Sequence, residues 1–176
     1  IVRPRMPARH ADFQHSADER LGVMQIVVEE GIRAPRPLTF AVASDVLSWP
    51  SLVSSIRSTE LLTREPIGAG TRFRETRHIH GSLATGEMMF AEFEPPNLFV
   101  LTAQNHGARY RIEHIFDEVP HGTGLTVRFF ATPLTTSARL MSPLALLFRY
   151  ALHRHLKADI ADLKASIEGR NPSPSN

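Results

Sequence analysis

The chain has 176 residues, of which 42% are hydrophobic and 22% charged, with a formal net charge of +2 and no cysteine. This size and composition are typical of one globular domain, large enough to fold without a metal or a disulfide. The lack of cysteine excludes disulfides, thiol nucleophiles and zinc–thiolate centres. It also fits a reducing compartment, so we expect a cytoplasmic protein.

Both ends of the chain differ in composition from its middle. Residues 1–21 are polar and rich in Pro, Arg and His, without the apolar core of a secretory signal. Residues 170–176 have the composition of a tail. We therefore expect a flexible arm at 1–21, one domain at 22–169 and a flexible tail at 170–176. No apolar run approaches the ~20 residues of a membrane span, and no basic run alternates with aromatics. We expect neither stable membrane insertion nor nucleic-acid binding.

The first part of the domain predicts a strand followed by two short helices. In Gly22–Ala34, apolar residues recur at every second position, which is typical of a half-buried strand. The prolines that follow cannot pair in a sheet but suit a first helical turn. Leu38–Ser44 then favours a short helix. Asp45 could cap the next turn through its carboxylate, and Pro50 ends or restarts that second piece.

From Ser54 onward the pattern predicts six further strands and one long helix. Short turns containing Gly, Pro or Asn separate alternating segments, which indicates an antiparallel meander. The final segment has apolar residues spaced by three and four, and we expect a helix of about 25 residues that starts at Ser142-Pro143 and stops at Gly169. Its apolar stripe is Leu144, Phe148, Leu152, Leu156, Ile160, Leu163 and Ile167.

These elements predict an α+β domain in which a curved antiparallel seven-stranded sheet wraps around the long C-terminal helix. A sheet with one apolar face and a helix with one apolar stripe bury each other most simply when the helix crosses the concave face. We expect such a curl to close imperfectly and to leave a cavity beside the N-terminal half of the helix. Trp49 lies at the break between the two short helices, where it could plug one end of the curl.

In order and spacing, four segments resemble the START/Bet v 1-like superfamily (SRPBCC) and, within it, the polyketide cyclase/dehydrase and lipid-transport branch. The segments are "IRAPRPLTFAVASDVLSWPSLV", "IGAGTRFRE", "EFEPPNLFVL" and "GTGLTVRFFATP", the last followed by a helix that ends in "LKASIEG". The resemblance covers nearly all of Gly22–Gly169. It implies the helix-grip fold and an internal cavity for a lipid, a polyketide or a similar apolar molecule, without a cofactor. It carries over no catalytic residue, because a fold hosts many activities.

Ten residues are candidates for contact with such a ligand. They are Trp49, Phe73, Glu75, Met89, Leu101, Tyr110, His114, Phe148, Leu152 and His155. Each has a structural alternative: Tyr110 could be a core tyrosine, and His155 could be a histidine at the edge of the core. The Met88-Met89 and Phe129-Phe130 pairs leave open which member faces inward, because both parities are apolar there.

Glu75 shares a strand face with Phe73 and would therefore point into the curl. An apolar cavity would raise the pKa of such a carboxyl and suit it to acid–base chemistry. Arg77 has the same parity, so a structural ion pair is equally available. Glu30 lies on the apolar face of the first strand. It too could be an acid–base group or a structural residue, and the sequence supports the acid–base role less than for Glu75.

Histidines supply the only candidate metal ligands. His78 and His80 share a face on a predicted strand and could chelate a metal, with His106 or His114 as a further donor. No spacing supports that third ligand, so we expect a solvated strand end and no metal. His153 and His155 diverge on a helix, since residues two apart lie about 200° around its axis.

Three functions remain open at this point. The protein could bind an apolar small molecule, or it could be a cofactor-independent cyclase or dehydratase. It could also dock a partner through the apolar segment "TPLTTSARLMSPLALLF", and a homodimer is left open. The enzyme hypothesis requires at least two of Glu75, Tyr110, His114 and His155 to meet within hydrogen-bond reach of a common point.

Overall fold

The computed structural model describes residues 24–79, 81–105, 107–135 and 145–170, apart from the side chains of 145–148 and 170. Strand β1 is followed by the short helices, then by six strands and the long helix α5. The elements are β1 (Met24–Ile32), α2 (Arg36–Ser44), η1 (Val46–Ser48), α3 (Trp49–Leu52), β2 (Ile56–Leu61), β3 (Arg72–Ile79), β4 (Ser82–Glu94), β5 (Leu98–Asn105), β6 (Ala108–Val119), β7 (Gly122–Pro133) and α5 (Ala145–Arg170).

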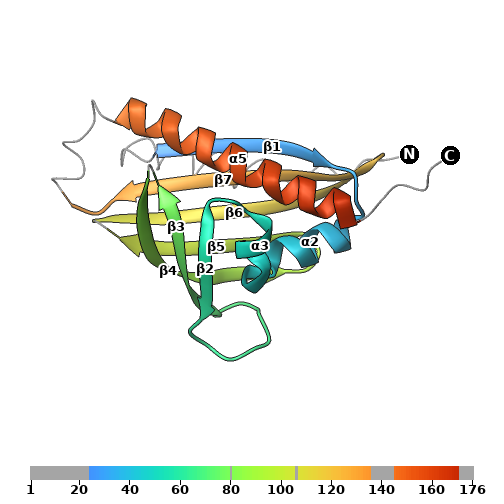
Figure 1. Ribbon diagram of the computed structural model, residues 1–176, viewed down its shortest axis with the longest axis horizontal. Helices are drawn as coiled ribbons and strands as arrows, with labels where there is room; N and C mark the ends of the chain where they lie inside the picture. Colours follow the sequence, from blue (N-terminus) through green and yellow to red (C-terminus); the bar gives the residue numbers. More distant parts are fainter. Residues whose placement is uncertain (1–23, 80, 106, 136–144, 171–176) are drawn as a thin grey trace, which may run out of the picture.

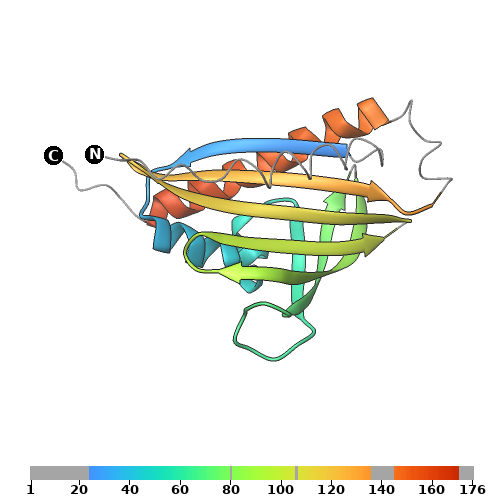
Figure 2. The same cartoon turned by 180° about the vertical axis from the view of Figure 1, so that it is seen from behind.

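All seven strands form one antiparallel sheet in the order β1-β7-β6-β5-β4-β3-β2. The sheet curves around α5, and α2 and α3 lie beside the C-terminal half of that helix (Figure 1). From behind, the strands cover the helices as a single layer (Figure 2). The predicted helix-grip fold is thus confirmed, down to the short helices after the first strand.

Local details differ from the sequence expectations at two places. Helix α2 begins at Arg36, two residues earlier than expected, because Pro35 and Pro37 fit its first turn. Asp45 does not cap the following turn through its side chain. Its carboxylate instead accepts a hydrogen bond from the Ser48 hydroxyl at 2.5 Å. Helix α5 has 26 residues and ends at Arg170, whereas the expected start at Ser142-Pro143 lies outside the described residues.

At one end of the sheet, aromatic side chains fill its inner, concave face. Phe99 is fully buried and lies 5.9 Å from the ring of Phe40 on α2, 5.6 Å from Phe90 and 5.8 Å from Phe116. Trp49 packs edge-on against Phe73 at 5.7 Å and donates its indole N–H to the Ala43 carbonyl at 3.0 Å. We call this the aromatic end. It comprises Phe40, Trp49, Phe73, Phe90, Phe99 and Phe116.

At the other end, the inner face carries small residues. Paired residues in an antiparallel sheet share a face, and the register therefore places five alanine and glycine positions inward. We call this the small-residue end. It comprises Ala84, Gly86, Ala103, Ala108 and Ala131, and all five are only partly buried.

Helix α5 is joined to both halves of the curl by polar contacts. Toward β1, the Lys164 ammonium lies 2.7 Å from the Glu30 carboxylate. Toward β2 and β3, Asp159 pairs with Arg77 at 3.0 Å and Asp162 accepts a hydrogen bond from the Ser54 hydroxyl at 2.6 Å. The helix therefore bridges the two edges of the sheet, and Glu30 is engaged in an ion pair.

Candidate functional site

Glu75 on β3 is a buried carboxylate with one unsatisfied oxygen. Its side chain is 3% exposed. Arg77 donates from Nε to Oε1 at 2.5 Å and from Nη1 to Asp159 on α5 at 3.0 Å. Asp159 also accepts a hydrogen bond from the Ser55 hydroxyl at 2.7 Å. The second oxygen, Oε2, is buried and has no hydrogen-bond partner among the described residues. Burial raises the pKa of Glu75 above its ordinary value, and the charge of Arg77 opposes this shift.

The inner face beside Glu75 is open. Gly86 on β4 is its partner in the sheet register, so a side chain at that position would project from the same face. A Cβ placed on Gly86 would meet no heavy atom within 4 Å. Glu75 therefore adjoins a position that no side chain occupies.

His114 on β6 lies between the two ends of the inner face. Its ring stacks on Phe99 at 4.2 Å, and its Nδ1 is buried without a hydrogen-bond partner among the described residues. Burial lowers the pKa of His114 to about 3, so its imidazole is neutral at physiological pH. The residue nevertheless keeps accessible surface. A deeply placed side chain with accessible surface indicates that packing around it is incomplete.

Tyr110 lies on the same strand and the same face as His114, toward the small-residue end. Its ring packs 5.7 Å from that of Phe129. Burial raises the pKa of its phenol. Tyr110 is only partly buried, like Ile112 between it and His114 and like Leu152 and Leu156 on α5.

The remaining predicted ligand contacts divide between the two ends. Trp49, Phe73 and Leu101 are buried in the core at 8%, 0% and 2% exposure. Leu152 and His155 are partly buried on α5. The side chain of Phe148 lies outside the described residues.

The expectation that Met89 faces the ligand is wrong. Met88, not Met89, is paired with the buried Phe73 and packs against the core, whereas Met89 is 37% exposed on the opposite face. Strand parity decides this, because adjacent residues point to opposite faces. The same rule turns Phe129 inward and leaves Phe130 less buried.

Sequence reasoning missed the residues that complete the environment of Glu75. Asp159 was not singled out, since nothing in the sequence pairs a helix carboxylate with an arginine 82 residues away. The small inward residues left a readable signal: Ala84 and Gly86 alternate with Leu83, Thr85 and Glu87 along one strand. Small residues at inward positions predict unfilled volume.

The polar candidates do not converge. Tyr110 and His114 are four residues apart on one strand, which separates their backbones by roughly 13 Å, and Glu75 lies three strands away from β6 in the sheet order. No three His, Asp or Glu side chains of the described chain are arranged to hold a metal. His78 is exposed, while His80 and His106 lie outside the described residues.

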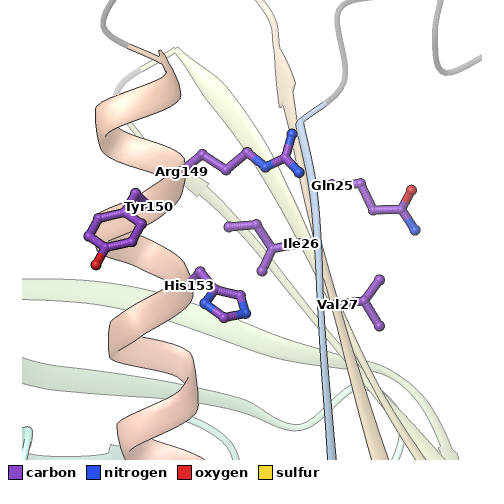
Figure 3. A pocket seen from close by; sticks show the side chains of 6 residues that line it. All are labelled: Gln25, Ile26, Val27, Arg149, Tyr150 and His153. Atoms are coloured by element: carbon purple, nitrogen blue, oxygen red, sulfur yellow. The ribbon is translucent and has the colours of Figure 1, made fainter.

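The two best-formed grooves of the described residues lie at the edge between β1 and α5 and over the outer face of the sheet. One, of about 560 Å³, straddles the free edge of β1 and is lined by Gln25, Ile26, Val27, Arg149, Tyr150 and His153. In Figure 3, Arg149 and His153 extend from α5 toward β1, and Tyr150 points away. The other, of about 490 Å³, lies over β4 and β5 and includes Met89, Thr102 and Gln104. Among the described helices, none is both long enough and apolar enough to cross a membrane.

Solved structures share this fold. The protein TTHA0849 from Thermus thermophilus superposes with a TM-score of 0.71 at 17% identity, over 84% of this chain and 99% of that one. The Zhui aromatase/cyclase from Streptomyces sp. R1128 gives a TM-score of 0.71 at 14% identity, over 88% and 99%. Ara h 8.0201 gives 0.69 at 14% identity, over 84% and 99%. No protein-family model and no curated protein matches the sequence. The chain thus has the helix-grip fold of the START/Bet v 1-like superfamily.

Proposed function

We propose that the protein binds a hydrophobic small molecule, such as a lipid or a polyketide, between the small-residue end of the sheet and the N-terminal half of α5. The observation that carries this proposal is the gathering of alanine and glycine at one end of an inner face whose other end is filled by aromatic rings. Around them Met88, Tyr110, Ile112, Leu152 and Leu156 remain only partly buried. Apolar surface that the protein leaves unburied can gain about 25 cal/mol per Å² when a ligand covers it.

Two further features support the same location. His114 keeps accessible surface although burial lowers its pKa to about 3. The fold is also shared with an aromatase/cyclase, which fits a cyclic or polyketide-like ligand. We keep a cytoplasmic location and a homodimer as predictions.

Filling the small-residue end tests the proposal. Ala103→Trp adds a large side chain on the inner face of β5, and the matched control Thr102→Trp adds it to the outer face of the same strand. We expect Ala103→Trp to weaken binding of 2-methoxynaphthalene at least about tenfold in a fluorescence titration, because it occupies the ligand's volume, equivalent to roughly 1.4 kcal/mol. Thr102→Trp should bind like the wild type.

Native mass spectrometry of protein purified from its own source supplies an independent measurement. We expect an apolar molecule to co-purify with the wild type and to be absent from Ala103→Trp. Equal binding by the two tryptophan variants would contradict the location. The absence of any bound molecule, together with no binding of the probe, would contradict the function itself.

A second candidate function is catalysis of cyclisation or dehydration by the same site. The raised pKa of buried Glu75 favours it, since a carboxyl whose pKa is raised exchanges protons more readily at physiological pH. The wide separation of Glu75, Tyr110 and His114 weighs against it. Conversion of a linear poly-β-keto thioester to a cyclic product by the wild type, and its loss in Glu75→Gln, would establish this candidate instead of simple binding.

A further inference from the structure

The unsatisfied oxygen of Glu75 is a buried acceptor with no hydrogen-bond donor among the described residues. Oε1 is bound by Arg77, and Arg77 is in turn held by Asp159. Oε2 is equally buried but receives no hydrogen bond from the described residues. A buried polar atom without a partner is unfavourable by roughly 1–3 kcal/mol. Such an atom is expected to be satisfied by a group from outside the chain.

Space for that group exists on the correct face. The neighbouring position in the register is Gly86, where a Cβ would meet nothing within 4 Å. On either side of Gly86, the inward residues of β4 are Ala84, which is small, and Met88, which is flexible. A ligand group could therefore enter beside Glu75 at Gly86, and it would reach the buried Oε2 once the side chains that cover this oxygen move.

The negative charge of Glu75 determines which kind of ligand group can bind to it. The Arg77 guanidinium pairs with Glu75 as a carboxylate, so Oε2 presents lone pairs and accepts hydrogen bonds. A ligand hydroxyl can donate to it, whereas an ether has no donor and a ligand carboxylate would bring a second negative charge. Like charges in a desolvated site repel strongly.

We propose that Glu75 Oε2 and the open position over Gly86 form a subsite that accepts a hydrogen bond from a hydroxyl group of the ligand. This inference rests on the proposed function and narrows it. The ligand is an apolar molecule that carries an alcohol or a phenol, and it is not a free fatty acid bound through its carboxylate.

Three naphthalene probes separate these chemistries: 2-naphthol donates a hydrogen bond, 2-methoxynaphthalene cannot, and 2-naphthoate is an anion. We expect wild-type protein to bind 2-naphthol about tenfold tighter than 2-methoxynaphthalene, as for a hydrogen bond to a charged acceptor. 2-Naphthoate should bind most weakly. Glu75→Gln should reduce the preference for 2-naphthol to less than about threefold, since the amide oxygen is a weaker acceptor.

Two control variants, Glu87→Gln and Gly31→Leu, and a second test variant, Gly86→Leu, make the result specific. Glu87→Gln removes a carboxylate that pairs with Arg72 and Arg74 on the exposed face, and it should keep the tenfold preference. Gly86→Leu fills the subsite and should abolish the preference even if Glu75→Gln does not fold. Gly31→Leu, at another strand glycine with open space around its Cβ, should behave as the wild type.

The outcomes separate the two proposals. Equal affinity of wild-type protein for 2-naphthol and 2-methoxynaphthalene would overturn the subsite while leaving the apolar binding function standing. A preference that survives both Glu75→Gln and Gly86→Leu would overturn it as well. Failure of wild-type protein to bind any of the three probes would overturn the proposed function and the subsite together.

Discussion

The aromatic end and the small-residue end belong to the same face of the same sheet, yet they are stabilised differently. At the aromatic end, rings from three strands and α2 interlock around Phe99 with centroid distances of 5.6–5.9 Å. At the small-residue end, alanine and glycine cannot reach across the curl. The backbone scaffold is common to both ends, so the two differ in side-chain volume, which is large in the closely packed aromatic end and small at the proposed ligand site.

Charged contacts join α5 to the sheet at both ends, through different strands. Glu75, Arg77 and Asp159 link β3 to α5 next to the small-residue end. At the aromatic end, Lys164 pairs with Glu30, which is in register through Leu125 with Phe116, and Thr39 and Thr123 make a buried hydroxyl contact at 3.2 Å. The first set includes the buried carboxylate of Glu75, to which the proposed ligand hydroxyl would bind.

The largest effect should follow from deleting a ring at the aromatic end. We expect Phe99→Ala to lower the free energy of unfolding by about 3–5 kcal/mol, because it leaves a cavity among closely packed rings. Tyr110→Ala at the other end should cost less than about 2 kcal/mol, since its side chain is already partly exposed. Urea unfolding measures the free energy of unfolding of both variants. Equal losses would show that the two ends are packed alike.

The charged contacts should give the next largest effect. Arg77→Met leaves Glu75 buried without a counter-ion, and we expect a loss of about 2–3 kcal/mol at pH 7.5, less than for a fully buried pair because Arg77 is 25% exposed. Without Arg77 nothing opposes the rise of the Glu75 pKa. The loss should therefore be absent below the ordinary value of 4.5 and should grow as the pH rises toward the raised pKa.

A double variant tests the origin of that loss. Arg77→Met combined with Glu75→Gln removes the buried charge as well as its partner, so much of the stability should return at pH 7.5. A loss for Arg77→Met that is the same at pH 4 and pH 7.5 would mean that packing, not charge, holds this end.

His114, at the boundary of the two ends, should make stability depend on pH. Its folded pKa of about 3 lies below the ordinary 6.5, so its contribution is complete above pH 6.5 and is lost as the pH falls toward 3. At pH 5 the loss from this group is about 2 kcal/mol. The melting temperature of His114→Phe should decline less between pH 7 and pH 5 than that of the wild type. The melting temperature of the control variant His121→Phe, at an exposed histidine, should decline like that of the wild type.

The smallest effect should come from adding volume at the small-residue end. We expect Ala103→Leu to change stability by less than about 1 kcal/mol, because the added methyl groups enter space that the fold leaves unfilled. Ala43→Leu, at a 1% exposed position in the aromatic end, should cost about 1–3 kcal/mol through overpacking. Similar costs at the two positions would contradict the presence of free volume at Ala103.

Residues whose environment is set by local pattern were predictable from the sequence. Alternation placed all seven strands, and the spacing of three and four placed α5, because each element buries one face. Phe73 and Glu75 were correctly assigned to the interior by strand parity. Parity failed at Met88-Met89, where both residues are apolar and no local rule distinguishes them.

Contacts between distant segments were not predictable. The Arg77–Asp159 pair depends on how α5 lies across the sheet, and side-chain spacing within either element does not contain that information. Asp45 departs from its expected capping role for a local reason, because its carboxylate accepts a hydrogen bond from the Ser48 hydroxyl three residues later. The open position at Gly86 could have been found by listing inward residues by volume once the register was known.

The pairing of β1 with β7 sets the order in which the molecule can be assembled. Met24 is the partner of Ala131, so the first strand must wait for more than one hundred further residues to be synthesised before it has a neighbour. Helix α5 leaves the ribosome later still. Until then the phenylalanine side chains of the nascent chain remain open to water, which makes slow folding with a need for chaperone protection the expected route.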